Sequence, residues 1–121
     1  SCRRFSGTAW LDAGNGATLR QTGPLTLEAW VHNSDLALAG KPRVLSKKPS
    51  EAAAEGYSLA YSPTQHDLIV AGSGPDLGLA DAADLGNTWH WVGATIDGAT
   101  ARTYPDGEEI TTDSSVTPLA A

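Results

Sequence analysis

The stretch TWHWVGATID, residues 88–97, predicts a β-strand with two different faces. Successive side chains of a strand point to opposite faces, so Trp89 and Trp91 share one of them. The other face carries one histidine and three aliphatic residues: His90, Val92, Ala94 and Ile96. Because this second face is apolar enough to be core, we expect the two tryptophans to look outward or to lie under loops on the outer face of the sheet. We interpret His90 as a structural residue rather than a functional one.

Two Asp-Gly dipeptides, at 97–98 and 106–107, follow this strand and predict tight turns. Glycine adopts a positive φ without steric cost, which suits a tight hairpin turn. The first turn would lead into a strand over Thr100–Tyr104. The second would lead into a further strand over Glu109–Thr112.

The remainder of the chain contains similar short runs, rich in alternating, β-branched or aromatic residues and separated by glycine and proline. We expect strands over Arg4–Ala13, Leu25–Asn33, Arg43–Lys47, Gly56–Ser62 and Asp67–Gly72. Residues 77–86 are either extended or form one helical turn. Glu51–Glu55 is too short for a stable helix, so we predict a single turn within a loop. The whole pattern is typical of an all-β fold, an antiparallel two-sheet β-sandwich with little helix.

The composition bounds the class of protein. At 121 residues the chain has room for one domain, which we take as residues 1–121. Its 8 Lys and Arg against 14 Asp and Glu give a formal net charge of −6, which argues against binding nucleic acid or anionic membranes. No apolar run approaches the ~20 residues that a membrane span requires. The single Cys2 excludes an internal disulfide and a cysteine zinc cluster.

Six phrases follow one another along the chain: FSG at 5–7, LTLEAWV at 25–31, VLSK at 44–47, GYSL at 56–59, NTWHWVGATIDG at 87–98 and YPDG at 104–107. Their order and spacing resemble the laminin-G-like, concanavalin A-like lectin/glucanase jelly roll of bacterial extracellular proteins. The resemblance covers nearly the whole chain. It implies the same jelly roll, located outside the cell or on its surface.

The chain departs from the wording of that family at three positions and at its end. Ser6 stands where the family has aspartate, Trp91 where it has a second histidine, and Pro105 where it has valine. Such domains also continue past the position of Ala121 with a closing strand. Some members bind calcium through the first and the closing strands. With Ser6 in place and the closing strand missing, we expect no cofactor, and calcium is implied by the resemblance alone.

The missing strand has a physical consequence. The terminal strands of these sandwiches lie next to each other, so Arg4–Ala13 would expose an unpaired row of amides and carbonyls beside an apolar core. We expect a second copy of the chain, another polypeptide or rearranged strands to cover this edge. The domain is therefore expected to form a homo-oligomer or to hold a partner chain.

The sequence contains no recognisable catalytic or metal-binding pattern. If the chain were a glycoside hydrolase of the fold class that it resembles, the resemblance implies a Glu-x-Asp-x-x-Glu run on one strand. Hydrolysis uses a pair of carboxyl groups. That run is absent, and the adjacent Glu108 and Glu109 would point to opposite faces of a strand. The histidines at 32, 66 and 90 lack the spacing of a transition-metal site. We therefore expect no enzymatic activity, no catalytic residue and no metal site.

Aromatic side chains are the first candidates for binding, because their flat faces stack on the C–H faces of sugar rings. The chain has four tryptophans. Trp30 and Trp89 match tryptophans in the family wording, which favours packing for them. Trp10 and Trp91 are less expected from that wording and are better candidates for an exposed platform. Tyr57, Tyr61 and Tyr104 are weaker candidates.

A basic cluster supplies the second group of candidates. Lys41, Arg43, Lys47 and Lys48 lie close together in an otherwise acidic chain. They form either a solvated loop or a small site for an acidic sugar or protein. In the second case Lys47 and Lys48 are the binding residues.

These observations lead to one expected function and one alternative. The aromatic content and the resemblance favour a non-catalytic module that binds carbohydrate, or recognises a protein, at the cell surface. The alternative is a structural or oligomerisation module without a small ligand. A glycoside hydrolase ranks last, since fold resemblance alone does not establish function.

Overall fold

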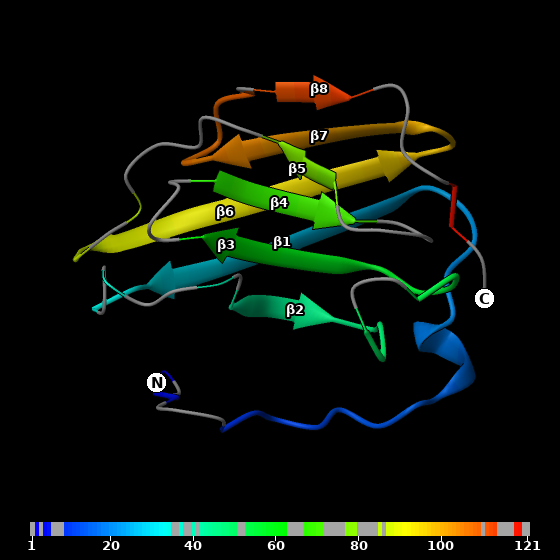
Figure 1. The fold of residues 1–121 in the computed structure, drawn as a ribbon, viewed down its shortest axis with the longest axis horizontal. Coiled ribbons are helices and arrows are strands. Elements are labelled where there is room, and N and C mark those ends of the chain that lie inside the picture. Colours follow the sequence, from blue (N-terminus) through cyan, green and yellow to red (C-terminus); the bar gives the residue numbers. More distant parts are fainter. Residues whose placement is uncertain are drawn as a thin grey trace.

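A computed structural model gives the fold as two antiparallel sheets of four strands each (Figure 1). The structure describes residues 2, 4–5, 9–34, 37, 40, 42–50, 53–62, 67–71, 77–79, 85, 87–109, 111–113 and 118–119. The all-β, two-sheet prediction is confirmed. In the described residues the helical content is one 3₁₀ turn, η1 (Ala17–Leu19), and no helix there is long and apolar enough to cross a membrane.

The eight strands divide equally between the two sheets. Sheet A has the order β1-β6-β7-β8, with β1 (Leu25–His32), β6 (Trp89–Asp97), β7 (Thr100–Pro105) and β8 (Thr111–Asp113). Sheet B has the order β2-β3-β4-β5, with β2 (Arg43–Ser46), β3 (Ser58–Ser62), β4 (Asp67–Ala71) and β5 (Leu77–Leu79). Figure 1 shows sheet B lying over sheet A, which leaves one face of each sheet turned away from the interior.

The core lies between the two sheets and follows from side-chain alternation. From β6 the inward residues Val92, Ala94 and Ile96 are buried, as the sequence predicted. From sheet B, Leu59 and Val70 pack into the same cluster. Burying apolar area of this kind stabilises the fold by roughly 25 cal/mol for each Å² removed from water.

The first predicted hairpin is confirmed. Asp97 pairs with Thr100, so Gly98 and Ala99 form the turn between β6 and β7. The neighbouring strands β3 and β4 also pair, in antiparallel register from Ser58 opposite Ala71. The alternating strand at Leu25–Asn33 exists as β1 and pairs with β6 along its whole length.

His90 fixes the second predicted turn, at 106–107, to the start of β6. Its Nδ1 lies 2.7 Å from Asp106 Oδ2, and its Nε2 lies 2.7 Å from Thr88 Oγ1. The Asp106 amide also donates to the Trp91 carbonyl at 2.7 Å. Both ring nitrogens of His90 therefore have partners, which is the arrangement of a structural histidine.

The strand predicted over Arg4–Ala13 is wrong for the described residues in that range, none of which belongs to a sheet. Figure 1 shows this N-terminal segment running past β2, outside both sheets. Alternation gave the segment a strand-like pattern, but no neighbouring strand offers it a hydrogen-bonding ladder. Among the described strands β1 pairs with β6 alone and β8 with β7 alone, so the edges of sheet A lie at β1 and β8 and not at the N-terminal segment.

Two further predictions fall partly outside the described residues. At the turn predicted within 51–55, the Ala53 amide donates to the Ser50 carbonyl at 3.3 Å, which closes one turn. Ala53–Glu55 form no helix, and residues 51–52 lie outside the described set. The segment 77–86 is extended at β5, which settles its first part. Leu85 is fully buried in the core. Residues 80–84 and 86 lie outside the described part of the chain.

The leucine pair across β2 and β3 tests where the core begins. Leu59 is 0% exposed, whereas Leu45, opposite it in the register, is 39% exposed. Leu59→Ala is expected to lower the free energy of unfolding by about 2–5 kcal/mol, because it leaves a cavity between the sheets. Leu45→Ala is expected to cost less than about 1 kcal/mol. Urea unfolding of both variants measures the difference, and equal losses would contradict this placement of the core.

Candidate functional site

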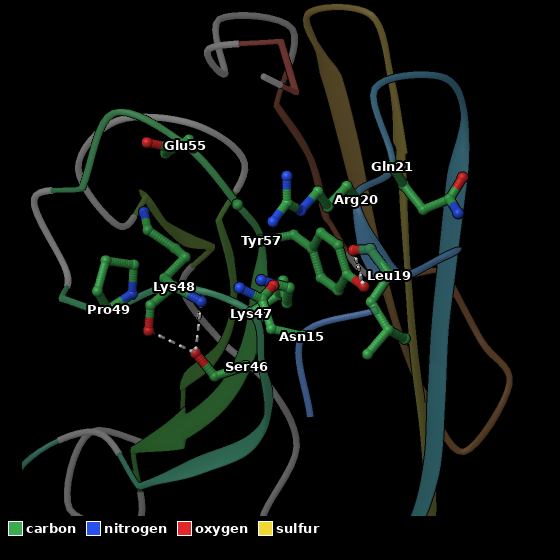
Figure 2. Close-up of a pocket in the computed structure, with 11 residues that line it drawn as sticks. Asn15, Leu19, Arg20, Gln21, Ser46, Lys47, Lys48, Pro49, Glu55 and Tyr57 are labelled. Carbon is green, nitrogen blue, oxygen red and sulfur yellow. Dashed lines mark hydrogen bonds between the residues drawn. The ribbon is translucent and has the colours of Figure 1, made fainter. Parts of the chain in front are cut away.

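A pocket of about 550 Å³ opens between the N-terminal segment and the loop that joins β2 to β3 (Figure 2). Its lining comes from three stretches of chain: Asn15, Leu19, Arg20 and Gln21; Ser46, Lys47, Lys48 and Pro49; Glu55, Gly56 and Tyr57. Ligand pockets in proteins commonly measure 300–1,000 Å³, so the volume suits a small molecule or one to two sugar rings.

The first wall is the backbone that leaves β2, and a cluster of hydrogen bonds holds it. The Lys48 amide donates to Ser46 Oγ at 3.2 Å. Arg43 Nη1 donates to the same oxygen at 3.0 Å and to the Lys48 carbonyl at 3.1 Å. Arg43, part of the predicted basic cluster, therefore supports the wall from behind and does not line the pocket.

The loop closes on itself at Gly56. The Lys47 amide donates to the Tyr57 carbonyl at 2.8 Å, which brings the two ends of the β2–β3 loop together. Gly56 has φ +94°, and a Cβ there would collide with the carbonyl oxygen of Lys47. Only glycine fits this position, because the backbone conformation is left-handed and the neighbouring backbone occupies the space of a side chain.

The second wall is the N-terminal segment, which the Tyr57 hydroxyl links to the sandwich. The η1 turn is closed by hydrogen bonds from the Leu19 amide to the Gly16 carbonyl and from the Arg20 amide to the Ala17 carbonyl, both 3.0 Å. Tyr57 Oη donates to the Leu19 carbonyl at 3.0 Å. Figure 2 shows Tyr57 between the strands of the sandwich and Leu19, with Arg20 beside it at the pocket.

The pocket is cationic in an acidic protein. Arg20, Lys47 and Lys48 line it, with Glu55 as the acidic group among the described lining residues, while the whole chain has a net charge of −6. Lys48 is 7% exposed, so much of its aliphatic stem is covered. Clefts lined by one sign of charge concentrate the field and attract ligands of the opposite sign.

The structure brings three of the predicted binding residues together. Tyr57, Lys47 and Lys48 all line the pocket. Trp10 lies on the N-terminal segment and is 79% exposed, and Trp91 lies on sheet A; neither lines this pocket.

Two features were missed or misjudged at the sequence level. Arg20 carried no signal, because it reaches the pocket through a contact between residues 38 positions apart in the chain. Packing was favoured for Trp30 and Trp89, but they are 68% and 52% exposed, on the outer face of sheet A. The alternation rule places them on that face, and no described segment covers them.

A comparison with protein families agrees with this fold. A sequence model of the concanavalin A-like lectin/glucanases superfamily matches residues 5–121. The chain belongs to this superfamily. Searches among curated proteins and among solved structures found no match.

Calcium, which the family resemblance implies for some members, is held by several oxygen donors, and no acidic cluster for it forms in the described part of the chain. There, His, Cys, Asp and Glu side chains nowhere form a group of three that could hold a metal ion. Ser6, the position at which the family has aspartate, lies outside the described residues. Calcium therefore stays an implication of the family resemblance.

Gly56→Ala is expected to destabilise the fold and to displace the pocket wall. Gly107→Ala is a matched control, because Gly107 has a similar φ of +84° with open space where a Cβ would lie. The control measures the cost of the left-handed conformation alone, about 1–2 kcal/mol. The collision with Lys47 should add roughly 1–3 kcal/mol for Gly56→Ala. Urea unfolding measures both variants, and equal losses would show that the close approach is unimportant.

Proposed function

We propose that this domain is a non-catalytic carbohydrate-recognition module that binds an acidic sugar in the cationic pocket. The observation that carries the proposal is the charge of the pocket, which Arg20, Lys47 and Lys48 line in a chain of net charge −6. Membership of a lectin/glucanase superfamily supports carbohydrate as the ligand class. Such a ligand is met outside the cell or on its surface, and we propose that the domain acts there.

The chemistry of the lining suits a uronate or a sulfated sugar. Arg20 presents a planar guanidinium that can hold a carboxylate or sulfate by two parallel hydrogen bonds. Lys47 adds a second cation from the opposite wall. Asn15 and Gln21 offer amide groups that can pair with sugar hydroxyls. A carboxylate between the two walls would therefore find both charge and directional donors.

Binding without hydrolysis is supported by the acidic groups near the pocket. Glycosidases use two carboxyl groups, about 5–9.5 Å apart, on either side of the scissile bond. Glu55 is the carboxylate that the described lining supplies, and it is exposed. A partner carboxylate would have to come from elsewhere.

The assembly alternative rests on a different observation, the edge of β1. Within the described part of the molecule, this eight-residue strand pairs with β6 on one side only. Long open edges tend to pair with another strand. If assembly is the function, light scattering should show a dimer or larger species at micromolar concentration. A monomer at all concentrations would contradict the alternative and leave the glycan proposal standing.

Charge removal at the pocket tests the glycan proposal. A glycan array with uronic, sulfated and sialylated chains, each beside its neutral counterpart, identifies the acidic ligand for titration. Arg20→Ala and Lys47→Ala are each expected to weaken binding about tenfold, because each removes a charge-assisted hydrogen bond worth roughly 1.5–3 kcal/mol. Raising the salt concentration should weaken the wild type as well.

The matched control is Arg4→Ala, since Arg4 is exposed and lies outside the pocket lining. It removes the same charge from the chain, so it separates a local contact from a net-charge effect. The proposal fails if no acidic glycan is retained at low salt. It also fails if Arg4→Ala weakens binding as much as Arg20→Ala.

A further inference from the structure

The outer face of sheet A carries a group of rings that the pocket does not use. Register places Trp30 opposite Trp91, His32 opposite Trp89, and Tyr104 opposite Gly93. All of these side chains alternate with the buried residues of their strands, so they share the outward face. We call this group the aromatic strip: Trp30, His32, Trp89, Trp91 and Tyr104.

Gly93 sets the position of the ring at the centre of the strip. A Cβ at Gly93 would lie 2.6 Å from Cη2 of Trp91 and 3.1 Å from two further carbons of the same ring. The six-membered ring of Trp91 therefore occupies the space that a side chain at 93 would fill, and Trp91 is half-buried as a result. Its indole lies close over the sheet between Glu28 and Tyr104, the two residues opposite Gly93.

The neighbouring rings remain largely in water. Trp30 and Trp89 are both more than half exposed, and the ring of His32 meets the ring of Trp89 edge to face, with centroids 5.5 Å apart. Tryptophan offers a large apolar surface that becomes buried when a partner binds. Exposed apolar patches of this kind mark interaction sites.

The polar side chains around the strip indicate which partner fits. Glu28 is exposed beside Trp91, and Tyr104 Oη donates to Glu109 Oε2 at 3.4 Å. Arg102 Nε lies 3.9 Å from Glu109 Oε1. The centres of protein–protein interfaces are depleted of charged groups. A pyranose ring, by contrast, presents an apolar C–H face with hydroxyls around its rim, and so matches rings bordered by donors and acceptors.

Charge separates this surface from the pocket. Among the described residues the charged groups named at this border are Glu28, Glu109 and Arg102, so their sum is negative, whereas the lining of the pocket is positive. An acidic sugar would be repelled by Glu28, and a neutral one would not be. We propose that the aromatic strip is a second glycan-binding surface, which stacks on the rings of a neutral oligosaccharide. The proposal extends the proposed function, but its site and its ligand class are different.

The test uses intrinsic tryptophan fluorescence and calorimetry with three neutral probes: cellohexaose, xylohexaose and mannohexaose. At least one of them should change the fluorescence and bind with equal affinity in low salt and in 0.5 M NaCl, because stacking involves no ion pair. Trp30→Ala and Trp89→Ala should each weaken that binding about tenfold. Both residues are largely exposed, so neither change should disturb the core.

Trp10→Ala is the matched control, because it removes an exposed tryptophan outside the strip. It should leave the affinity for the neutral probe unchanged, and so should Arg20→Ala at the pocket. If the wild-type domain binds a neutral probe but no acidic glycan, the pocket proposal fails and the strip proposal stands. Absence of binding to all three neutral probes overturns the strip proposal. So does a dimer, detected by light scattering, that Trp30→Ala dissociates, since a second copy would then be the occupant.

Discussion

Each residue of β6 must point either between the sheets or away from them. The core and the outer face of sheet A both depend on this constraint. Val92, Ala94 and Ile96 point inward and are buried in the core. Trp89 and Trp91 are left on the outer face. Because β6 pairs with β1 on one side and β7 on the other, a slip of one residue would exchange the two sets and bury the tryptophans in place of the aliphatic residues.

The strands could be predicted where the sequence itself determines the ladder partner. A short turn fixes the register between β6 and β7, and alternation then assigns each face. The segment 4–13 shows the limit of this reasoning, because its alternation predicted a strand but could not supply a neighbour. Strand formation depends on pairing, which a local pattern does not contain.

The candidate site was predictable in part, for a related reason. Lys47 and Lys48 are adjacent in the sequence, and Tyr57 follows within one loop, so local clustering of charge and an aromatic residue could indicate them. Arg20 joins them only because a tyrosine hydroxyl reaches the Leu19 carbonyl from far along the chain. The family resemblance favoured a packed Trp30, but the ring is largely exposed. A shared tryptophan indicates the residue type and does not indicate what covers its ring.

The hydrogen bond from Tyr57 to the Leu19 carbonyl gives the pocket a property that the sheets do not share. The stretch that carries Arg20 belongs to neither sheet, so it can detach without breaking a single ladder bond. The fraction of molecules in which this cationic wall is attached is then set by a local opening equilibrium and not by the global stability of the sandwich. An occupant bridging both walls would slow amide exchange at Leu19 and Arg20 while leaving exchange in β6 unchanged.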